Sequence, residues 1–413
     1  MKRKRKSRKN VVLIVAIDIS GAFDAISWTT IVRNVINAHC SDAVVNACEN
    51  LLIGRRVNIN GQTFHSEKGT PQGGRASPAL FKIGLNALLN KLNEHKIDHV
   101  AYADDLALVL SASTQNVLQE KLSNAFDLIR NWCSEAELAV NEQKTELMLT
   151  TRKRSAKWTL RLNGGEAHIS DQLKYLGVVI DKRLSWKEHI TYLDSKLTTM
   201  IDRVRRFSWM QADLEWRFKR KLYFNVFLPT ITYASAAWFR DISSKTTFLD
   251  KLRRIQRRFV IAASGAYKST PNIRLMRLLG VTDVVDELNT LSEARERGAL
   301  DSKQLKYQRR TEAIERMERF EVDLQKFDAD RIGNKYVTWC VSNSGPFKWF
   351  LRRIGKAEDE RCRYCGAESE TAGHLLFDCN SQSVRLTEES GMREINDTCR
   401  KLISKLLVDV WRI

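Results

Sequence analysis

Residues 98–112, DHVAYADDLALVLSA, hold two short apolar segments that are separated by only three residues. Val100–Tyr102 and Leu106–Leu110 read as strands, and the connection between them contains Asp104 and Asp105. A connection of this length joins antiparallel strands in a tight hairpin. The sequence therefore predicts a hairpin that carries two carboxylates at its tip.

A third carboxylate follows another apolar strand. Val11–Ile17 is short, continuous and rich in β-branched residues, which is typical of a buried strand, and Asp18 comes directly after it. Taken alone, Asp18 is equally a helix cap, and Asp104-Asp105 an ordinary polar turn. Together they favour a shared site, because three nearby carboxylates repel one another unless cations neutralise them. Mg²⁺ prefers such oxygen ligands, and phosphoryl transfer uses two ions about 3.5–4 Å apart.

Strand and helix patterns alternate up to about Trp186, which predicts an α+β arrangement for this part of the chain. Asn60-Gly61 is a turn signal within a strand pair near Arg55–Phe64. Ser113 or Thr114 would cap the helix that follows the acidic hairpin. The apolar face predicted for that helix consists of Leu118, Leu122, Phe126, Ile129 and Cys133.

After His189 the chain becomes helical and basic, and aromatic residues lie among the cations. This pattern favours a surface that tracks phosphates and stacks bases. The alternative is a solvated helical face with the aromatic residues in the core, and both can hold for different residues. The first cluster comprises Arg203, Arg205, Arg206, Arg217, Lys219, Arg220 and Lys221 with Phe207, Trp209, Trp216, Phe218 and Tyr223; the second comprises Arg253, Arg254, Arg257 and Arg258.

The whole chain is basic. Lys and Arg outnumber Asp and Glu by 68 to 49 in 413 residues, which gives a formal charge of +19. Such an excess favours a polyanionic partner, because each cation that meets a phosphate releases condensed counterions. No apolar run reaches the roughly 18–20 residues that span a membrane, so we expect nucleic acid and no membrane.

The N-terminus and the cysteines indicate the compartment. Residues 2–9, KRKRKSRK, are either a disordered tail or a nuclear-import or nucleic-acid patch. The apolar run after them is too short for a signal peptide, so secretion is rejected. Most of the eight cysteines are scattered singly, which is typical of a reducing compartment. We expect a soluble intracellular protein, in the nucleus or otherwise the cytoplasm.

Residues 362–379 place three cysteines and one histidine at the spacing Cys-x₂-Cys-x₈-His-x₄-Cys. Three thiolates and one imidazole suit a closed, tetrahedral Zn²⁺ site of the structural kind. Gly366 and Gly373 would permit sharp turns beside the ligands. Chance clustering is the alternative, and the spacing favours zinc. The expected ligands are Cys362, Cys365, His374 and Cys379.

Five segments, in order, resemble sequence motifs of the reverse transcriptases of retrotransposons. One such segment alone is a weak signal, and five in order are a strong one. Gly345–Cys379 further resembles the C-terminal segment of LINE-type (non-LTR) elements, within a Pol-like open reading frame. The five segments are AIDISGAFD at 16–24, GTPQG at 69–73 continued by SPALF at 77–81, YADD at 102–105, VN through KT at 140–145, and YLG of the primer-grip hairpin at 175–177.

The resemblance implies a polymerase right hand: an α+β palm, in which helices cover an antiparallel sheet, then a helical thumb and a small zinc knuckle. The predicted divisions are a polybasic tail or fingers stub at 1–10, the palm at 11–186, the thumb at 187–300, a helical connector at 301–355, the knuckle at 356–385 and a C-terminal helix at 386–413.

The resemblance also implies roles for the catalytic residues. Asp18, Asp104 and Asp105 would bind two Mg²⁺ ions, helped by the carbonyl of Ile19. Lys144 would protonate the leaving pyrophosphate or steady its charge, and a surface lysine is its alternative.

Five further positions correspond to nucleotide or template contacts. Phe23 would lie under the incoming sugar and select deoxynucleotides, or else be a core residue. Pro71, Gln72 and Gly73 would approach the nucleotide and template, with a plain Pro-Gly turn as the alternative, and Tyr102 completes this set.

The implied activity is that of an RNA-directed DNA polymerase, a nucleotidyltransferase that uses Mg²⁺ and carries Zn²⁺. Its partners would be an RNA template, a DNA primer or target and deoxynucleoside triphosphates. A long fingers region precedes the first aspartate in that family, and Gly74, Arg75 and Ala76 depart from the loop's pattern. We therefore expect a fragment or degenerate copy. The alternatives are a truncated, non-catalytic nucleic-acid-binding remnant and, third, a host-adopted scaffold protein.

Overall fold

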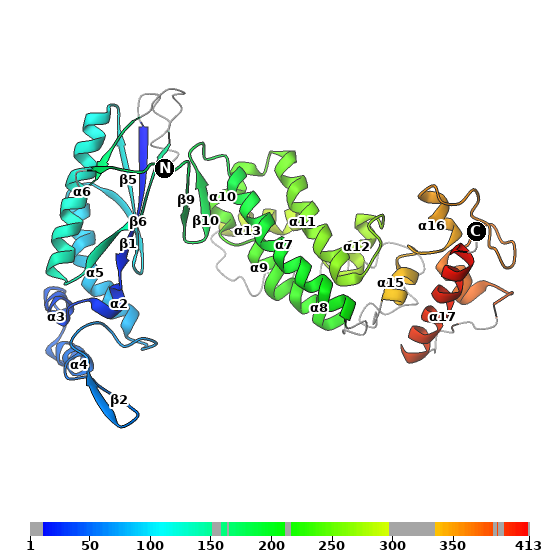
Figure 1. The fold of residues 1–413 in the computed structure, drawn as a ribbon, viewed down its shortest axis with the longest axis horizontal. Coiled ribbons are helices and arrows are strands. Elements are labelled where there is room, and N and C mark those ends of the chain that lie inside the picture. The colour runs from blue at the N-terminus through cyan, green and yellow to red at the C-terminus, as the bar shows by residue number, and fades with distance from the viewer. Residues whose placement is uncertain are drawn as a thin grey trace. The chain divides into compact units, whose positions relative to one another are not determined.

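The structure is a computed structural model with two compact units, residues 1–189 and 190–413 (Figure 1). The predicted polybasic tail and most of the predicted connector, residues 301–334, lie outside the described residues. The described ranges are 11–150, 158–162, 165–210, 216–296, 335–382, residue 386 and 392–411.

The first unit is built on an antiparallel sheet of four strands in the order β4-β5-β1-β6. The strands are β1 (Val11–Ser20), β4 (Asp98–Tyr102), β5 (Asp105–Ala112) and β6 (Ala139–Thr150). Every second side chain of β1, from Val11 to Ile19, packs into a core shared with helices, and Ile14 packs on Met148 and Leu173 on the other face. Because both faces are covered, the strand is apolar almost throughout.

Helices cover one face of this sheet (Figure 1). α5 (Ser77–Glu94) and α6 (Gln115–Glu135) contact its strands, α2 (Ala22–Ala25) and α3 (Trp28–Asn37) pack on α5, and α4 (Asp42–Leu52) packs on α3. The predicted apolar face of α6 is confirmed, since all five of its side chains are buried. Thr114 occupies the N-cap position, without a side-chain hydrogen bond to the helix.

Three two-stranded sheets complete the unit. The predicted strand pair is confirmed as β2 (Arg56–Ile59) and β3 (Gln62–His65), with Asn60-Gly61 as the turn. The other pairs are β7 (Arg161–Leu162) with β8 (Gly165–Glu166), and β9 (Gln172–Tyr175) with β10 (Val178–Asp181). The β9-β10 hairpin supplies Leu173 to the small core on the sheet's second face. The observed α+β architecture with an antiparallel sheet agrees with the predicted fold class.

The elements described in the second unit are helical. A buried polar centre ties several of them together, because Gln256 Nε2 donates to Tyr223 Oη at 2.7 Å and its Oε1 accepts from Val284 N at 3.0 Å. No helix among the described residues has the length and apolar character to cross a membrane. The elements are α7 (Lys187–Met210, which begins at the end of the first unit), α8 (Trp216–Leu222), η1 (Tyr223–Phe227), α9 (Leu228–Ile231), α10 (Ser235–Ile242), α11 (Thr246–Ser264), α12 (Asn272–Leu279), α13 (Val284–Glu296), α15 (Lys335–Val341), α16 (Lys348–Arg353), η3 (His374–Asp378) and α17 (Met392–Trp411).

Candidate active site and metal site

Strand register brings the three aspartates together. Asp18 of β1 is the pairing partner of Asp105 on β5, and Asp104 lies in the turn between β4 and β5. Residues directly opposite in an antiparallel pair have Cα atoms about 4.5–5.5 Å apart. Partial burial, then the charges of Asp104 and Asp18, raise the pKa of the Asp105 carboxyl. The three groups therefore share one electrostatic environment.

Lys144 reaches this cluster through an irregularity in β6. The pairing of β1 with β6 shifts between Ala16, which faces Glu146, and Asp18, which faces Asn141. The extra residues of β6 form a bulge, in which Lys144 N donates to Asn141 Oδ1 at 3.2 Å. Lys144 Nζ lies 3.4 Å from Asp18 Oδ2, so the ammonium offsets part of the negative charge.

The aspartate cluster suits a divalent cation. Its donors are carboxylate oxygens, which hard cations prefer. Burial and, after it, repulsion from Asp104 and Asp18 raise the pKa of Asp105, and a cation would relieve that repulsion. Ile19 is buried in the core and its backbone pairs with Val140. Asp105 is exposed and Asp18 and Asp104 are partly exposed, so the site is open to substrate.

The loop that begins at Gly69 is docked on α2. Gly69 N donates to Ile26 O at 2.8 Å and Thr70 N donates to Phe23 O at 2.7 Å. Gly69 has a φ of +75°, and a Cβ there would collide with the backbone of Asp24. Only glycine fits this close approach, which fixes the loop beside the strand end that carries Asp18.

The polar side chain of the loop is held from α2. Gln72 Nε2 donates to Asp24 Oδ1 at 2.8 Å and to Oδ2 at 3.0 Å, and Gln72, like Gly73, is exposed. Pro71 is half-buried, and its carbonyl accepts from Ser77 Oγ. No sequence pattern indicated this contact of Asp24, although Asp24 ends the segment AIDISGAFD at 16–24.

The aromatic residues of the site differ in exposure. The ring of Phe23 stacks on buried Phe81 with centroids 4.4 Å apart, so one face of Phe23 belongs to the core while the residue stays partly exposed. Tyr102 is 66% exposed and free to contact a ligand. Tyr175 Oη donates to Val100 O at 3.3 Å and to Asp105 O at 3.2 Å, which links β9 to the acidic hairpin. That link had no sequence signal.

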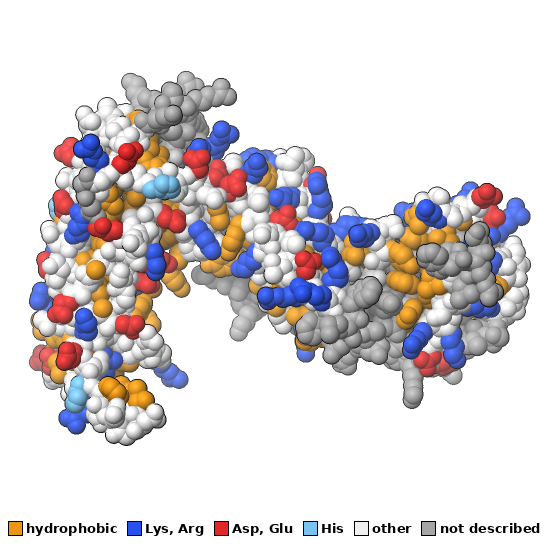
Figure 2. Space-filling view, viewed as in Figure 1, with side chains coloured by type: hydrophobic (Ala, Val, Ile, Leu, Met, Phe, Trp, Pro, Cys, Tyr) orange, Lys and Arg blue, Asp and Glu red, His pale blue; other side chains and the backbone are white. Residues whose placement is uncertain are grey.

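Some residues of the basic helices are exposed, as a nucleic-acid surface requires, and others serve the core or internal contacts. Arg203, Arg205 and Arg206 are exposed, and Figure 2 shows Lys and Arg side chains scattered over the visible face, with acidic and hydrophobic ones among them. Tyr223, in contrast, is buried. Arg253 pairs with Asp283, Arg257 donates to Thr270 O and Arg258 pairs with Asp194, so three of the four arginines of α11 serve internal contacts. The side chains of Phe207, Trp209, Trp216 and Arg217 lie outside the described residues.

The cysteines and the histidine of residues 362–379 converge. One ligand atom from each of Cys362, Cys365, His374 and Cys379 lies within 4.8 Å of all the others, the only such group of three or more Cys, His, Asp or Glu residues in the described part of the chain. Cys362 Sγ is 3.9 Å from Cys379 Sγ, and Cys365 Sγ is 3.2 Å from His374 Nε2. Three sulfurs and one nitrogen at this closeness fit tetrahedral Zn²⁺. The aspartates form a looser group.

The backbone of the metal loop folds tightly around these ligands. Gly366 has a φ of +76°, and its N–H donates to Cys362 O at 2.9 Å. The turn predicted at Gly373 is wrong, because that residue has a helical φ of −59° at the start of η3. Burial raises the pKa of the Cys362 thiol to about 11, whereas the backbone N–H of Ala367 lowers the pKa of exposed Cys365.

Comparisons with known proteins place these features in a family context. Residues 2–180 match the model of the family described as reverse transcriptase (RNA-dependent DNA polymerase). The Pol polyprotein of the type-1 retrotransposable element R1 of Bradysia coprophila is 28% identical over 301 residues, which cover 71% of this chain and 29% of that protein. The RNA-directed DNA polymerase of the mobile element jockey of Drosophila funebris is 25% identical over 263 residues, 60% of this chain and 28% of that protein.

The chain thus spans less than a third of the length of these two relatives. Among solved structures, telomerase from Candida tropicalis, in complex with a fragment of telomeric RNA, covers 78% of this chain and 51% of its own at 12% identity, with a TM-score of 0.36. A TM-score this low supports no conclusion about fold or function.

Proposed function

Because this chain belongs to the reverse transcriptases of LINE-type (non-LTR) retrotransposons, we propose that it adds deoxynucleotides to a primer 3′-OH under the direction of an RNA template. One observation carries the proposal: Asp18 pairs across the sheet with Asp105, next to Asp104 in the turn. Carboxylates on paired strands hold a reaction centre more rigidly than loops would.

In this proposal the aspartates and the Ile19 carbonyl hold two Mg²⁺ ions. Mg²⁺ bound there supplies the positive charge that activates the 3′ oxygen and neutralises the triphosphate. Lys144, whose Nζ already faces Asp18, donates a proton to the leaving pyrophosphate or steadies its charge. The bulge in β6 aims this lysine at the cluster.

The docked loop and the aromatic residues shape the nucleotide pocket. Gln72, oriented by Asp24, offers its remaining amide atoms to nucleotide or template. Phe23 is backed by Phe81 and so presents a fixed edge, which would exclude a ribose 2′-OH. Tyr102 is exposed beside the aspartates, where a ring can stack on a base or sugar.

Finer assignments belong to the same proposal. We propose a palm at 11–186 and a helical thumb at 187–300 whose exposed cations contact the duplex backbone. The ligands of the Cys/His group hold a structural Zn²⁺, and the surrounding knuckle contacts template RNA or target DNA. The basic residues 2–9 support a nuclear location.

Primer extension tests the proposal. Purified chain, a primed RNA template, Mg²⁺ and labelled deoxynucleotides are compared with Asp104→Asn and with Asp127→Asn, an exposed aspartate on α6. Wild type and Asp127→Asn should incorporate label, whereas Asp104→Asn should lose incorporation and retain salt-sensitive RNA binding. Binding without incorporation in all three proteins would overturn the proposal in favour of a non-catalytic remnant.

A further inference from the structure

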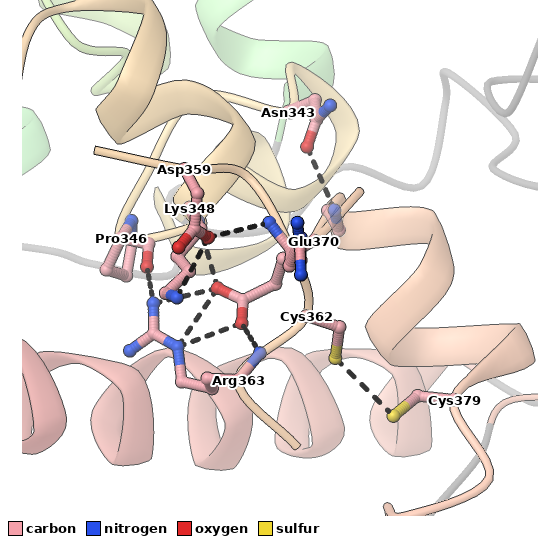
Figure 3. A network of polar contacts seen from close by, with 10 residues as sticks. Asn343, Pro346, Lys348, Asp359, Cys362, Arg363, Glu370 and Cys379 are labelled. Carbon is pink, nitrogen blue, oxygen red and sulfur yellow. Dashed lines mark hydrogen bonds and ion pairs between the residues drawn. The ribbon is translucent and has the colours of Figure 1, made fainter. Parts of the chain in front are cut away.

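The metal loop encloses an ion pair that is not part of the ligand set. Glu370 is fully buried, and Arg363, which follows the first ligand Cys362, is 15% exposed at its side chain. Arg363 Nε lies 2.9 Å from Glu370 Oε2, and Arg363 Nη2 lies 2.7 Å from Oε1 (Figure 3). Two parallel N–H···O contacts of this kind make the strongest and most directional form of an arginine–carboxylate pair.

The remaining hydrogen bonds of the pair hold the metal loop to itself and to the residues around the start of α16. Glu370 Oε2 accepts from Arg363 N at 2.8 Å, and Oε1 accepts from Lys348 N, at the start of α16, at 2.9 Å. Arg363 Nη2 also donates to Pro346 O at 2.9 Å. Nearby, Ala372 N donates to Asn343 Oδ1 at 2.9 Å. The pair and the Ala372–Asn343 bond together join the metal loop to residues 343–348.

The positions of the two charges in the chain matter for the ligands. Arg363 lies between Cys362 and Cys365, and Glu370 lies four residues before His374. A buried charge whose partner is removed is left uncompensated, so both segments are held where the pair can form. Fixing these two points fixes the distance between the Cys-x₂-Cys turn and the start of η3.

We propose that Glu370 and Arg363 are positioning residues that preset the four ligands before the metal binds. The inference rests on the zinc site proposed above and adds residues 343–348 to the metal-binding unit, which therefore begins before the boundary predicted at 356. Partners behind a ligand shell that orient the ligands typically contribute tenfold to a hundredfold to metal affinity.

Cobalt binding to the full chain tests this. Co²⁺ in tetrahedral thiolate sites absorbs visible light, so its affinity is measured by titration and by competition with Zn²⁺. Glu370→Gln should raise the Kd for Co²⁺ about tenfold to a hundredfold, because the Arg363 cation loses its counter-charge. Glu368→Gln, an exposed carboxylate in the same loop, should change the Kd less than about twofold. Equal affinities of the wild type and Glu370→Gln would overturn the inference.

Hydrogen exchange on the metal-free wild type provides a second measurement that needs no variant. The backbone amides of Arg363 and Lys348, which donate to Glu370, should stay protected after chelation. Exchange at the rate of an unstructured peptide would overturn the presetting of the loop. Absence of any Co²⁺ spectrum in the wild type would instead refute the zinc site, and preserved protection would still show that the ion pair orders the loop.

Discussion

The aspartate cluster and the Cys/His group both bring potential metal ligands together, but the ligands come from different distances along the chain. Asp18 and the Asp104-Asp105 turn lie on separate strands and meet only through the sheet register. The cysteines and the histidine come from residues 362–379, and a buried ion pair lies behind them. The first site depends on the whole sheet, and the second on a local loop.

The difference in openness follows from the difference in construction. Lys144 and Asp18 at the first site are 69% and 29% exposed at their side chains. A cation or a substrate phosphate can therefore reach these side chains from solvent. Cys362 and Cys379 are 3% and 0% exposed, and among the four ligands only Cys365 is exposed. A site with open positions suits chemistry, and a closed four-ligand site suits structure.

The largest expected effect is the loss of nucleotide addition in a Lys144 variant. Without that loss, the aspartate cluster could not be called the reactive site of the two. Lys144→Met should lower the single-turnover rate of nucleotide addition at least about a hundredfold, because it removes the proton donor and the cation beside Asp18. The thermal unfolding midpoint and the zinc content should not change, since an exposed ion pair contributes about 0–1 kcal/mol.

A matched control is Lys91→Met. Lys91 pairs with Glu135 at 3.3 Å, nearly the Lys144–Asp18 separation, but on the helices α5 and α6. Its loss should leave the rate unaltered. A wild-type rate in Lys144→Met would mean that this residue is only a surface lysine.

Acid should separate the two sites. The pKa of Cys362 is raised to about 11, so zinc must displace thiol protons, and affinity falls as pH falls. Each proton released contributes about tenfold per pH unit, which predicts at least about a hundredfold weaker zinc binding at pH 6 than at pH 8.

The aspartate site releases no thiol protons over this range. The Mg²⁺ concentration for half-maximal synthesis should therefore change by less than about threefold between the same two pH values. Chelator competition measures the first quantity and primer extension the second. Parallel pH dependence at both sites would contradict the distinction between them.

Two glycines sharpen the contrast between a sheet-built and a loop-built site. Gly69 and Gly366 have nearly equal φ values of +75° and +76°, but a Cβ at Gly69 would strike the backbone of Asp24, whereas nothing lies within 4 Å of one at Gly366. Gly69→Ala should cost about 3 kcal/mol or more of folding stability, and Gly366→Ala about 1–2 kcal/mol for the backbone alone.

Denaturant unfolding of each variant measures these costs, with Trp fluorescence and Co²⁺ absorption as separate probes. Equal costs would show that the Gly69 loop can leave α2 without penalty. The result would then remove the reason for placing Gln72 near the nucleotide.

Sequence patterns predict the parts of both sites that depend on periodicity or spacing. Asp18 follows one apolar strand pattern, and Asp104 and Asp105 lie between two others. This placement predicted that the three aspartates meet, because a pleated strand fixes where its end lies. The spacing of Cys362 to Cys379 predicted the metal group, since short loops limit how far ligands can separate.

Other contacts left no such pattern. The bulge that aims Lys144 depends on the register between β1 and β6, which no local residue specifies. The Gln72–Asp24 and Arg363–Glu370 contacts join polar residues that look like ordinary solvated positions in the sequence. Buried polar partners are chosen by the assembled fold, so a single sequence conceals them.

The smallest expected effect is on the rate of nucleotide addition, and it is tested with two tyrosines that make contacts through different parts of the side chain. Tyr175 uses its hydroxyl, which bonds Val100 O and Asp105 O, whereas Tyr364 offers its ring to Lys405 Nζ at 4.5 Å. Tyr175→Phe should slow nucleotide addition by about threefold to tenfold, the value of one neutral hydrogen bond. Tyr364→Phe keeps the ring face and should leave both the rate and the zinc affinity within about twofold.

The Tyr175 hydroxyl bonds main-chain atoms on both sides of the aspartate turn, so its removal should loosen the turn rather than the fold. The unfolding midpoint should therefore stay nearly constant while the Mg²⁺ concentration for half-maximal activity rises. If the unfolding midpoint falls and the Mg²⁺ concentration for half-maximal activity does not rise, Tyr175 serves only the small core around Leu173. The β9-β10 hairpin would then not position the aspartates.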